Sequence, residues 1–394
     1  MSRVELPLPA THGRYLEQVE YALAFVGQEV RAFEIDEEAG VLALTLGDGV
    51  DEDSIRKKVL TLLDRYVDEQ FGERSRTYFH KEGSLARPDA WEELLGRRWI
   101  TMAGQGHVIM RGPAAKLMRV VDAVVLRDFA EVFGAEEEVY PSTILCTTLD
   151  RCNHYSSFPE HVDFVAHLKP DVDVLGSFAE ACSEGGWRPA LHQNRMAEPD
   201  FAVSPSCCYH CYEGMEGWSL EAPGRCVTAV LGCHRFEGAN HRTLRRLRAF
   251  TMREVIWVGA PSFVLESRAE ADRMIEAWAA RWQLDCSYEV ANDMFFTDNY
   301  SVRASFQRQQ EAKKELRASL AREGHDLSIF SSNFHSNTFG KAFDITIGGR
   351  PAVSACLGWG LERIVFALLS QHGLEVQDWP TALQEDYVGF GGGV

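Results

Sequence analysis

Long apolar segments are missing from this 394-residue sequence. No run of about 18 apolar residues occurs, so a transmembrane helix is not expected. The opening stretch, MSRVELPLPATHGRYLEQVE, contains no apolar block of signal-peptide length. Internal repeats and low-complexity tracts are absent as well. With 45% apolar and 25% charged residues, the composition is that of an ordinary globular protein, and a cytoplasmic location is the default expectation.

Positive charge is also scarce. The 40 basic residues are outnumbered by 58 acidic ones, and the formal net charge is -18. A protein that holds a large polyanion usually presents a basic face. The acidic balance therefore argues against a nucleic-acid partner, although a local basic patch within an acidic chain would still permit one.

The ten cysteines accompany no secretory signal. They are therefore expected to be reduced thiols, most of them small buried apolar side chains. Three of them lie close together in the sequence, namely Cys207, Cys208 and Cys211. Such a group suggests a metal ligand among them.

Residues 1–90 are expected to form a small N-terminal α/β extension. Apolar spacing predicts helices over 16–33 and 51–71, and the segment VLALTL (41–46) predicts a short strand that ends at a GDG turn. The polar stretch 74–89 has few aliphatic residues and contains Gly83 and Pro88. It is expected to be a linker.

Residues 91–394 are expected to form one larger domain. The segment HVIMRG (107–112) predicts a strand, and a long amphipathic helix is predicted over 113–134, with a proline at its start and a glycine at its end. Further apolar segments follow at 227–237, 253–259, 342–349 and 357–373, the last of them a helix that opens with glycines. Strands and helices do not alternate regularly, so the predicted fold class is α+β with an antiparallel sheet.

An arginine-rich loop lies between two of the apolar segments. Arg235-Phe236-Glu237 is followed by GANHRTLRRLRAF (238–250), whose arginines are Arg242, Arg245, Arg246 and Arg248. Guanidinium groups bind phosphate oxygens in pairs, so the loop suits a triphosphate. Taken alone, the loop would fit a solvated basic hairpin equally well.

A second segment, Gly358-Trp359-Gly360-Leu361-Glu362-Arg363, opens the last predicted helix. Glycines allow a ligand to approach the backbone, and an arginine in the first helical turn points at whatever lies at that end. Because Gly-x-Gly before a helix is common, this segment alone is a weak signal.

Taken together, the two segments resemble motifs 2 and 3 of class II aminoacyl-tRNA synthetases. They supply Arg-x-Glu, a basic loop, Phe250 and, farther along the chain, Gly-x-Gly-x-Glu-Arg. The helix 113–134 and Pro141 resemble motif 1, the dimerisation element, more loosely. The resemblance implies a class II synthetase-like antiparallel sheet flanked by helices, and a homodimer through 113–145.

A third set of residues narrows the family. Cys208 in SCCYHCY, Glu254 in FTMREV and Cys356 in VSACLGWGLER resemble the zinc site of methanogenic-type seryl-tRNA synthetases. They resemble still more closely that of the amino acid–carrier protein ligases, which are truncated homologues of those synthetases. No CxxC or HxxxH spacing relates the three to one another, so spacing alone would not select them. Similar segments in the same order cover roughly 97–390, among them FPEHVDF (158–164), CHRFE (233–237), ANDMFF (291–296) and SSNFHSNTFGKAFDI (331–345).

The resemblance assigns a role to each metal ligand. Two thiolates and one carboxylate leave the fourth tetrahedral position of zinc open. The family implies that the α-amine of the substrate fills it. Cys207 and Cys211 are expected to be structural thiols. Met294 stands where the family more often has proline, and it either lines the amino-acid pocket or simply packs.

The resemblance also implies an ATP site. Arg235 should hold the α-phosphate and Arg363 the γ-phosphate, while Glu237 lies beside the nucleotide. Arg246 matches the loop arginine, and Phe250 matches the ring on which adenine stacks. Catalysis then needs positioning and charge neutralisation rather than a general base. Magnesium should accompany ATP, and both Glu323 and Asp326 are candidate ligands.

Three functions follow from this resemblance. The main prediction is an amino acid–carrier protein ligase, which converts ATP to AMP and pyrophosphate and passes a small amino acid (glycine, alanine or serine) to a phosphopantetheine thiol. One alternative is aminoacylation of tRNA of the seryl-tRNA synthetase type. The other is a catalytically inactive paralogue that binds ATP or an amino acid, which the complete set of site residues disfavours. The net charge of -18 and the lack of an N-terminal heptad arm argue against tRNA as the partner.

Overall fold

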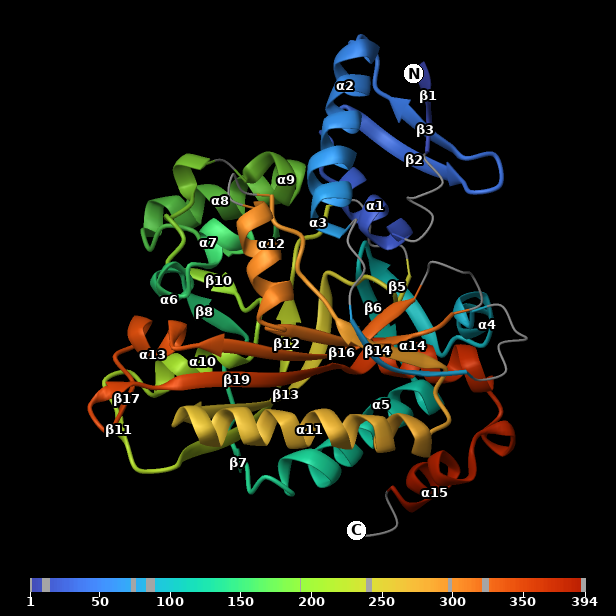
Figure 1. The fold of residues 1–394 in the computed structure, drawn as a ribbon. Helices are drawn as coiled ribbons and strands as arrows, with labels where there is room; N and C mark the ends of the chain where they lie inside the picture. Colours follow the sequence, from blue (N-terminus) through green and yellow to red (C-terminus); the bar gives the residue numbers. More distant parts are fainter. Residues whose placement is uncertain are drawn as a thin grey trace.

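The computed structural model describes residues 2–8, 15–71, 76–82, 89–191, 193–238, 243–296, 300–320 and 326–390. Its largest element is an eight-stranded sheet with the strand order β4-β14-β15-β16-β19-β13-β12-β7 (Figure 1). All neighbouring strands in it run antiparallel except β12 and β7, which are parallel. The predicted α+β class with an antiparallel sheet is therefore confirmed.

The centre of this sheet is buried on both faces. In order across the sheet, its strands are β4 (Thr77–Lys81), β14 (Cys286–Val290), β15 (Lys313–Ala318), β16 (Leu327–Ser336), β19 (Val353–Gly360), β13 (Ala249–Gly259), β12 (Gly224–His234) and β7 (Glu136–Glu137). Strand β19 is buried except at its two end residues, and β13 is buried from Arg253 to Gly259. Buried runs of this kind are expected where structure covers both sides of a strand.

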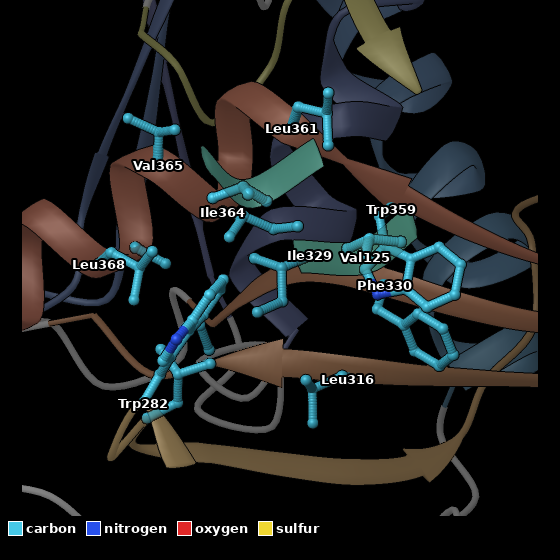
Figure 2. Close-up of a cluster of buried hydrophobic side chains, with 14 of the residues drawn as sticks. Val125, Trp282, Leu316, Ile329, Phe330, Trp359, Leu361, Ile364, Val365 and Leu368 are labelled. Carbon is cyan, nitrogen blue, oxygen red and sulfur yellow. The ribbon is translucent and has the colours of Figure 1, made fainter. Parts of the chain in front are cut away.

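Helices cover one face of the sheet. Helices α11 (Pro261–Arg281) and α5 (Gly112–Val125) lie along that face in Figure 1. The main core gathers between the sheet and α14 (Leu361–His372), where Ile364 lies near Ile329 and Leu368 lies toward Trp282 (Figure 2). This core fixes the strands that carry the site.

Helix α5 continues directly into the π-helix η3 (Leu126–Ala130). Together they confirm the helix predicted over 113–134 as far as Ala130. Its apolar residues, including Leu117, Val121 and Val125, are buried in the main core of the same chain. Its apolar face therefore already has a partner, and it gives no argument for a dimer.

The N-terminal unit, shown in blue in Figure 1, has its own three-stranded antiparallel sheet of order β1-β3-β2. Its elements are β1 (Ser2–Pro7), α1 (Leu16–Leu23), β2 (Val30–Asp36), β3 (Val41–Leu46), α2 (Glu52–Leu62), η2 (Leu63–Asp68) and α3 (Glu69–Phe71). The predicted strand 41–46 and the helix over 51–71 are confirmed. The helix predicted over 16–33 is wrong beyond Leu23, because Val30–Asp36 pairs with β3 instead.

The stretch 74–89 is not a linker throughout. Thr77–Lys81 forms β4, which pairs with β14 at one edge of the large sheet. We propose that the chain consists of an N-terminal extension, 1–90, and a catalytic domain, 91–394. Strand β4 belongs to the extension by sequence, but it is hydrogen-bonded to β14 of the catalytic domain. Gly83 and Pro88 lie outside the described residues.

The remaining elements are short. Before the arginine-rich loop they are α4 (Trp91–Gly96), β5 (Ile100–Gly104), β6 (His107–Met110), β8 (Thr143–Leu145), α6 (Cys146–Arg151), α7 (His154–Ser157), η4 (Pro159–His161), β9 (Phe164–Val165), α8 (Val172–Gly185), α9 (Trp187–Ala190), η5 (Gln193–Arg195), β10 (Phe201–Val203), α10 (Cys208–Gly214) and β11 (Ser219–Leu220). After it they are α12 (Tyr300–Gln309), α13 (Thr338–Ala342), β17 (Thr346–Ile347), β18 (Arg350–Pro351), η6 (Val376–Asp378) and α15 (Thr381–Gly389). No helix in the described ranges is long and apolar enough to cross a membrane.

Candidate active site

Three elements bring the predicted metal ligands together. Glu254 lies on β13, Cys356 lies on the neighbouring strand β19, and Cys208 is the first residue of α10. One ligand atom from each residue lies within 4.8 Å of the other two, and all three residues are buried. Two strands and a helix thus bring the three side chains together, although their spacing along the sequence does not indicate it.

The chemistry of this group fits a cation. Glu254 Oε1 accepts hydrogen bonds from the Cys207 amide at 3.1 Å and from Ser206 Oγ at 3.4 Å, whereas Glu254 Oε2 is buried without a partner among the described residues. Burial raises the pKa of Glu254, and a hydrogen bond with Cys208 together with burial raises that of Cys356. Buried anionic ligands are costly unless a charge compensates them, and two thiolates with one carboxylate suit zinc.

The neighbouring thiols do not join this group. Cys207 packs with Ala229, Leu231 and Cys233, whereas Cys211 packs in the apolar cluster that also contains Cys208 and Cys356. Neither belongs to the potential metal-binding group found among the described residues. A structural role for both stays a prediction.

The metal-ligand group opens into a cavity of about 720 Å³. Cys208, Glu254 and Cys356 line one part of the cavity. Its other lining residues include Arg235, Glu237, Phe250 and Arg363. Seven of the eight predicted site residues thus face one space, and Arg246 does not.

Two arginines on the cavity wall are held by carbonyl oxygens. Arg235 Nε donates to the Pro205 carbonyl oxygen at 3.0 Å, and Arg363 Nη1 donates to that of Ser328 at 3.1 Å. In the described part of the chain, neither guanidinium has a carboxylate within ion-pair distance. Their positive charges are therefore available to an anionic ligand in the cavity.

The motif 3 segment is tied to the motif 2 strand. Glu362, in the first turn of α14, accepts hydrogen bonds from the Thr251 amide and hydroxyl on β13, at 2.8–3.0 Å. These bonds fix the start of α14 against the sheet. Arg363 is consequently presented to the cavity from a rigid helix end.

Arg246 lies behind the wall that Glu237 forms. Its guanidinium pairs with Glu237, reaches Glu17 at 3.4 Å and lies 4.6 Å from the centroid of the Tyr21 ring. Burial would raise the pKa of Glu237, but the nearby cations, Arg246 foremost, lower it to about 2. A direct contact between Arg246 and a nucleotide stays a prediction.

The other predictions have mixed outcomes. Met294 packs in the core of the N-terminal unit, which decides between the two roles left open for it. Asp326 does not line the cavity, so its role as a magnesium ligand stays a prediction. Arg242 and the other magnesium candidate, Glu323, lie outside the described residues.

The sequence did not point to a group of rings on the cavity wall. His154, Phe158, His161 and Tyr209 lie with neighbouring ring centroids 5.3–6.1 Å apart. Burial, helped by Arg235, lowers the pKa of His154 and of His161 to about 3, so both rings are neutral near pH 7. The segment FPEHVDF matched the family, but its residue types indicate no role until η4 and α7 fold beside α10.

His335 was missed as well. Its Nε2 lies 3.8 Å from Cys356 Sγ, and its Nδ1 lies 3.1 Å from the Tyr212 hydroxyl. Such a contact orients a metal ligand from outside the coordination sphere. Only the pairing of β16 with β19 brings His335 to this place.

Comparisons with known proteins find relatives of two kinds. No protein-family model matches the chain. The type-2 serine–tRNA ligase of Methanococcus maripaludis (strain C5) is 23% identical over 327 residues, which cover 81% of this chain and 62% of that protein. That of Methanopyrus kandleri is 24% identical over 394 residues, covering 91% and 74%. The amino acid–acyl-carrier-protein ligase 1 of Bradyrhizobium diazoefficiens is 28% identical over 257 residues, covering 64% and 76%.

Solved structures show the same fold. The M. kandleri SerRS in complex with A. aeolicus tRNASec matches with a TM-score of 0.70 at 22% identity, over 93% of this chain and 75% of that one. The cytoplasmic serine–tRNA ligase of Naegleria fowleri in complex with AMP matches with a TM-score of 0.62 at 11% identity, over 86% and 79%. The chain spans about three fifths of the length of the first of its curated relatives. It is thus related to the type-2 seryl-tRNA synthetases and the amino acid–carrier protein ligases, and it has the class II aminoacyl-tRNA synthetase fold.

Proposed function

We propose that this chain activates an amino acid with ATP, forming an aminoacyl adenylate and releasing pyrophosphate. One observation carries the proposal. The same cavity is lined by the metal-ligand group Cys208, Glu254 and Cys356 and by two arginines, Arg235 and Arg363, that are not ion-paired in the described part of the chain. An amine-binding metal beside a phosphate-binding pair of cations would hold both substrates of this reaction in one space.

Each part of the cavity has a task in the proposed reaction. Zinc held by the two thiolates and the carboxylate would offer its open coordination position to the substrate amine. Phe250 supports the adenine ring, while Arg235 and Arg363 neutralise the phosphates. A carboxylate oxygen of the amino acid then attacks the α-phosphorus as the bond to pyrophosphate breaks. The attacking group is already an anion, so orientation and charge neutralisation are sufficient, and magnesium accompanies the ATP.

For the acceptor, tRNA has the broader support, and we propose serine as the amino acid on the same ground. Type-2 serine–tRNA ligases are the more numerous of the relatives compared, and one matching structure holds tRNA. The net charge of -18 had argued against tRNA, but charge summed over a whole chain says little about one local surface.

A carrier protein is the second candidate acceptor. The carrier-protein ligase is 28% identical, against 23–24% for the tRNA ligases, and this chain covers 76% of its length against 62% for the first tRNA ligase. Both acceptors would receive the same activated amino acid.

The deciding experiment has two steps. Pyrophosphate exchange with each amino acid in turn tests activation, and a response to serine, glycine or alanine is expected. Transfer is then measured side by side to bulk tRNA and to phosphopantetheinylated carrier protein. Charged tRNA without thioester supports the first acceptor, and thioester without charged tRNA supports the second. Absence of exchange with every amino acid would leave only a binding protein without catalysis.

A further inference from the structure

The N-terminal unit is built into the active-site region rather than attached loosely to it. The Gln70 amide group of α3 is buried and exchanges two hydrogen bonds of 3.0 Å with the backbone of Phe295. Met294 belongs to the core of the N-terminal unit, and the Phe296 ring centroid lies 5.0–5.8 Å from those of three aromatic residues of that unit, Tyr21, Phe25 and Tyr66. Met294 and Phe296 are therefore held in the N-terminal unit, and the backbone of Phe295 between them is bonded to it.

Helix α1 of this unit packs directly against the end of the motif 2 strand. A Cβ atom placed on Gly238 would lie 2.7 Å from the Ala24 carbonyl oxygen, and Gly238 adopts a φ of +67°. Only glycine permits both the conformation and the close approach. The chain that follows Glu237 is thus pressed onto the end of α1.

Helix α1 carries one carboxylate into a cluster of arginines. Glu17 Oε2 accepts a hydrogen bond from Arg317 Nη2 at 2.6 Å, and Glu17 Oε1 lies 3.4 Å from Arg246 Nη2. The side chain of Glu17 is 21% exposed and those of both arginines are 13% exposed. Burial would raise the pKa of Glu17, but Arg317, Arg246 and Arg363 together lower it to about 2. Glu17 is therefore an anion at neutral pH.

Each of the two arginines holds a second carboxylate, and these second carboxylates line the cavity. Arg246 pairs with Glu237, and Arg317 Nη1 donates to Glu315 Oε2 at 3.2 Å. Arg317 Nε also lies 3.6 Å from Glu289, and Glu315 also pairs with Lys313 at 3.0 Å. Glu237 and Glu315 are on the cavity wall together with Arg363, whereas Glu17, Arg246 and Arg317 are not. Glu17 is therefore connected to Glu237 through Arg246 and to Glu315 through Arg317.

We infer that Glu17 is a positioning residue of the nucleotide site, which fixes the wall carboxylates Glu237 and Glu315 through Arg246 and Arg317. The inference rests on the proposed function, because it assumes that the cavity holds ATP. Without Glu17, the two arginines, whose side chains are only 13% exposed, lose the anion that they share, so their mutual repulsion is less well compensated. Glu237 and Glu315 would then lose their fixed places beside Arg363. Because Glu17 lies behind the wall, it does not compete with the phosphates for space.

The test measures binding of Mg·ATP to the full-length, zinc-loaded protein by calorimetry. Glu17→Gln keeps the shape of the side chain and removes its charge, and it should weaken ATP binding on the order of tenfold, as for the loss of one buried charged partner. Glu17→Asp should lie between this variant and the wild type. Glu69→Gln is the matched control, because Glu69 contacts Tyr300 in the same interface and lies outside the cavity wall. It should bind ATP as the wild type does.

Two further readouts separate positioning from general stability. In pyrophosphate exchange, Glu17→Gln should raise KM for ATP and leave KM for the amino acid unchanged. In a Glu237→Gln background, Glu17→Gln should have a smaller effect than in the wild type, because the two residues act through the same contacts. Additive effects would contradict the inference.

Failure of the inference about Glu17 and failure of the proposed function give different results. A wild-type protein that does not bind Mg·ATP would overturn both. A wild type that binds it, with Glu17→Gln binding equally or more tightly, would overturn the inference and leave the proposed function standing. If Glu17→Gln lowers the unfolding temperature, the comparison is made with Glu17→Asp, whose unchanged ATP affinity would equally overturn the inference.

Discussion

The guanidinium carbon of Arg235 lies 5.3 Å from the centroid of the Phe250 ring, and both side chains line the cavity. The two come from opposite sides of one hairpin, since Phe250 on β13 pairs with Cys233 and Arg235 directly follows the end of β12. A planar ring and a phosphate-binding cation are thus held side by side. This is the arrangement required for a nucleotide whose base stacks on the ring while its phosphate meets the arginine.

Phe250→Ala should weaken ATP binding by roughly 10- to 100-fold, because stacking of a base on an aromatic side chain contributes roughly 1–3 kcal/mol. The affinity is measured by calorimetry with Mg·ATP. Phe236→Ala is the control, since that ring lies in the same hairpin but does not line the cavity. Equal losses in both variants would argue against adenine on Phe250.

Cys356→Ala should abolish metal binding. The purified wild type is expected to contain about one zinc per chain, since this ligand set makes one tetrahedral site. Elemental analysis provides the measurement. Cys207→Ala should keep the metal, because Cys207 is a direct neighbour of Cys208 but lies outside the ligand group. Full exchange activity in a metal-free wild type would contradict the zinc proposal.

Arg363→Ala should reduce pyrophosphate exchange by roughly 100- to 1,000-fold, the usual cost of removing one group that stabilises charge in the transition state. Its half-buried guanidinium has no carboxylate within ion-pair distance in the described ranges, so its charge is available to the phosphates. Arg350→Ala, an exposed arginine on β18, serves as the control. Unchanged exchange in Arg363→Ala would exclude a role in phosphate binding.

Acid should destabilise the cluster around Glu17. The pKa of Glu17 and that of Glu237 are lowered from 4.5 to about 2 in the folded protein. A lowered pKa adds stability that is complete above the unfolded pKa and is lost as the pH falls toward the folded pKa. The free energy of unfolding should therefore decrease between about pH 4.5 and 2, by at most about 3 kcal/mol for Glu17 alone. Urea unfolding across this range should show a shallower decrease for Glu17→Gln, and an identical slope would contradict the ion pairs.

The homodimer remains a prediction from the class resemblance. Within 113–145, Val132 is 61% exposed and Val139 is 93% exposed, and β7 forms an edge of the large sheet. Sedimentation should show a dimer at micromolar concentration, and Val139→Glu should shift it toward the monomer because a charge would enter an apolar interface. A monomeric wild type at that concentration would refute the prediction.

Local sequence patterns predicted the parts of the fold that depend on near neighbours. Apolar spacing and end residues predicted the helix over 51–71, the strand at 41–46, the arginine-bearing hairpin and a helix over 113–134, which is helical as far as Ala130. Strand β4 was not predicted, because it is a short polar edge strand defined by its pairing with β14. Residue patterns alone give no signal for such pairing across more than 200 positions of sequence.

The site, too, has residues that the sequence indicated and residues that only distant contacts reveal. Resemblance to known motifs indicated the residues that touch the cavity, and seven of these eight lie on its wall. Glu17 carried no such signal, since a glutamate in an amphipathic helix is ordinarily a solvated residue. Its role depends on Arg317, 300 positions farther along the chain.

The pairing of β4 with β14 has a consequence for any attempt to isolate the catalytic part. A fragment that begins at residue 91 would lack β4, leaving the backbone groups of β14 unpaired along an open sheet edge. It would also expose Met294 and Phe296, whose apolar surfaces are covered by the N-terminal unit. An open edge beside fresh apolar surface is a template for intermolecular strand addition. Such a fragment should aggregate rather than behave as a minimal enzyme.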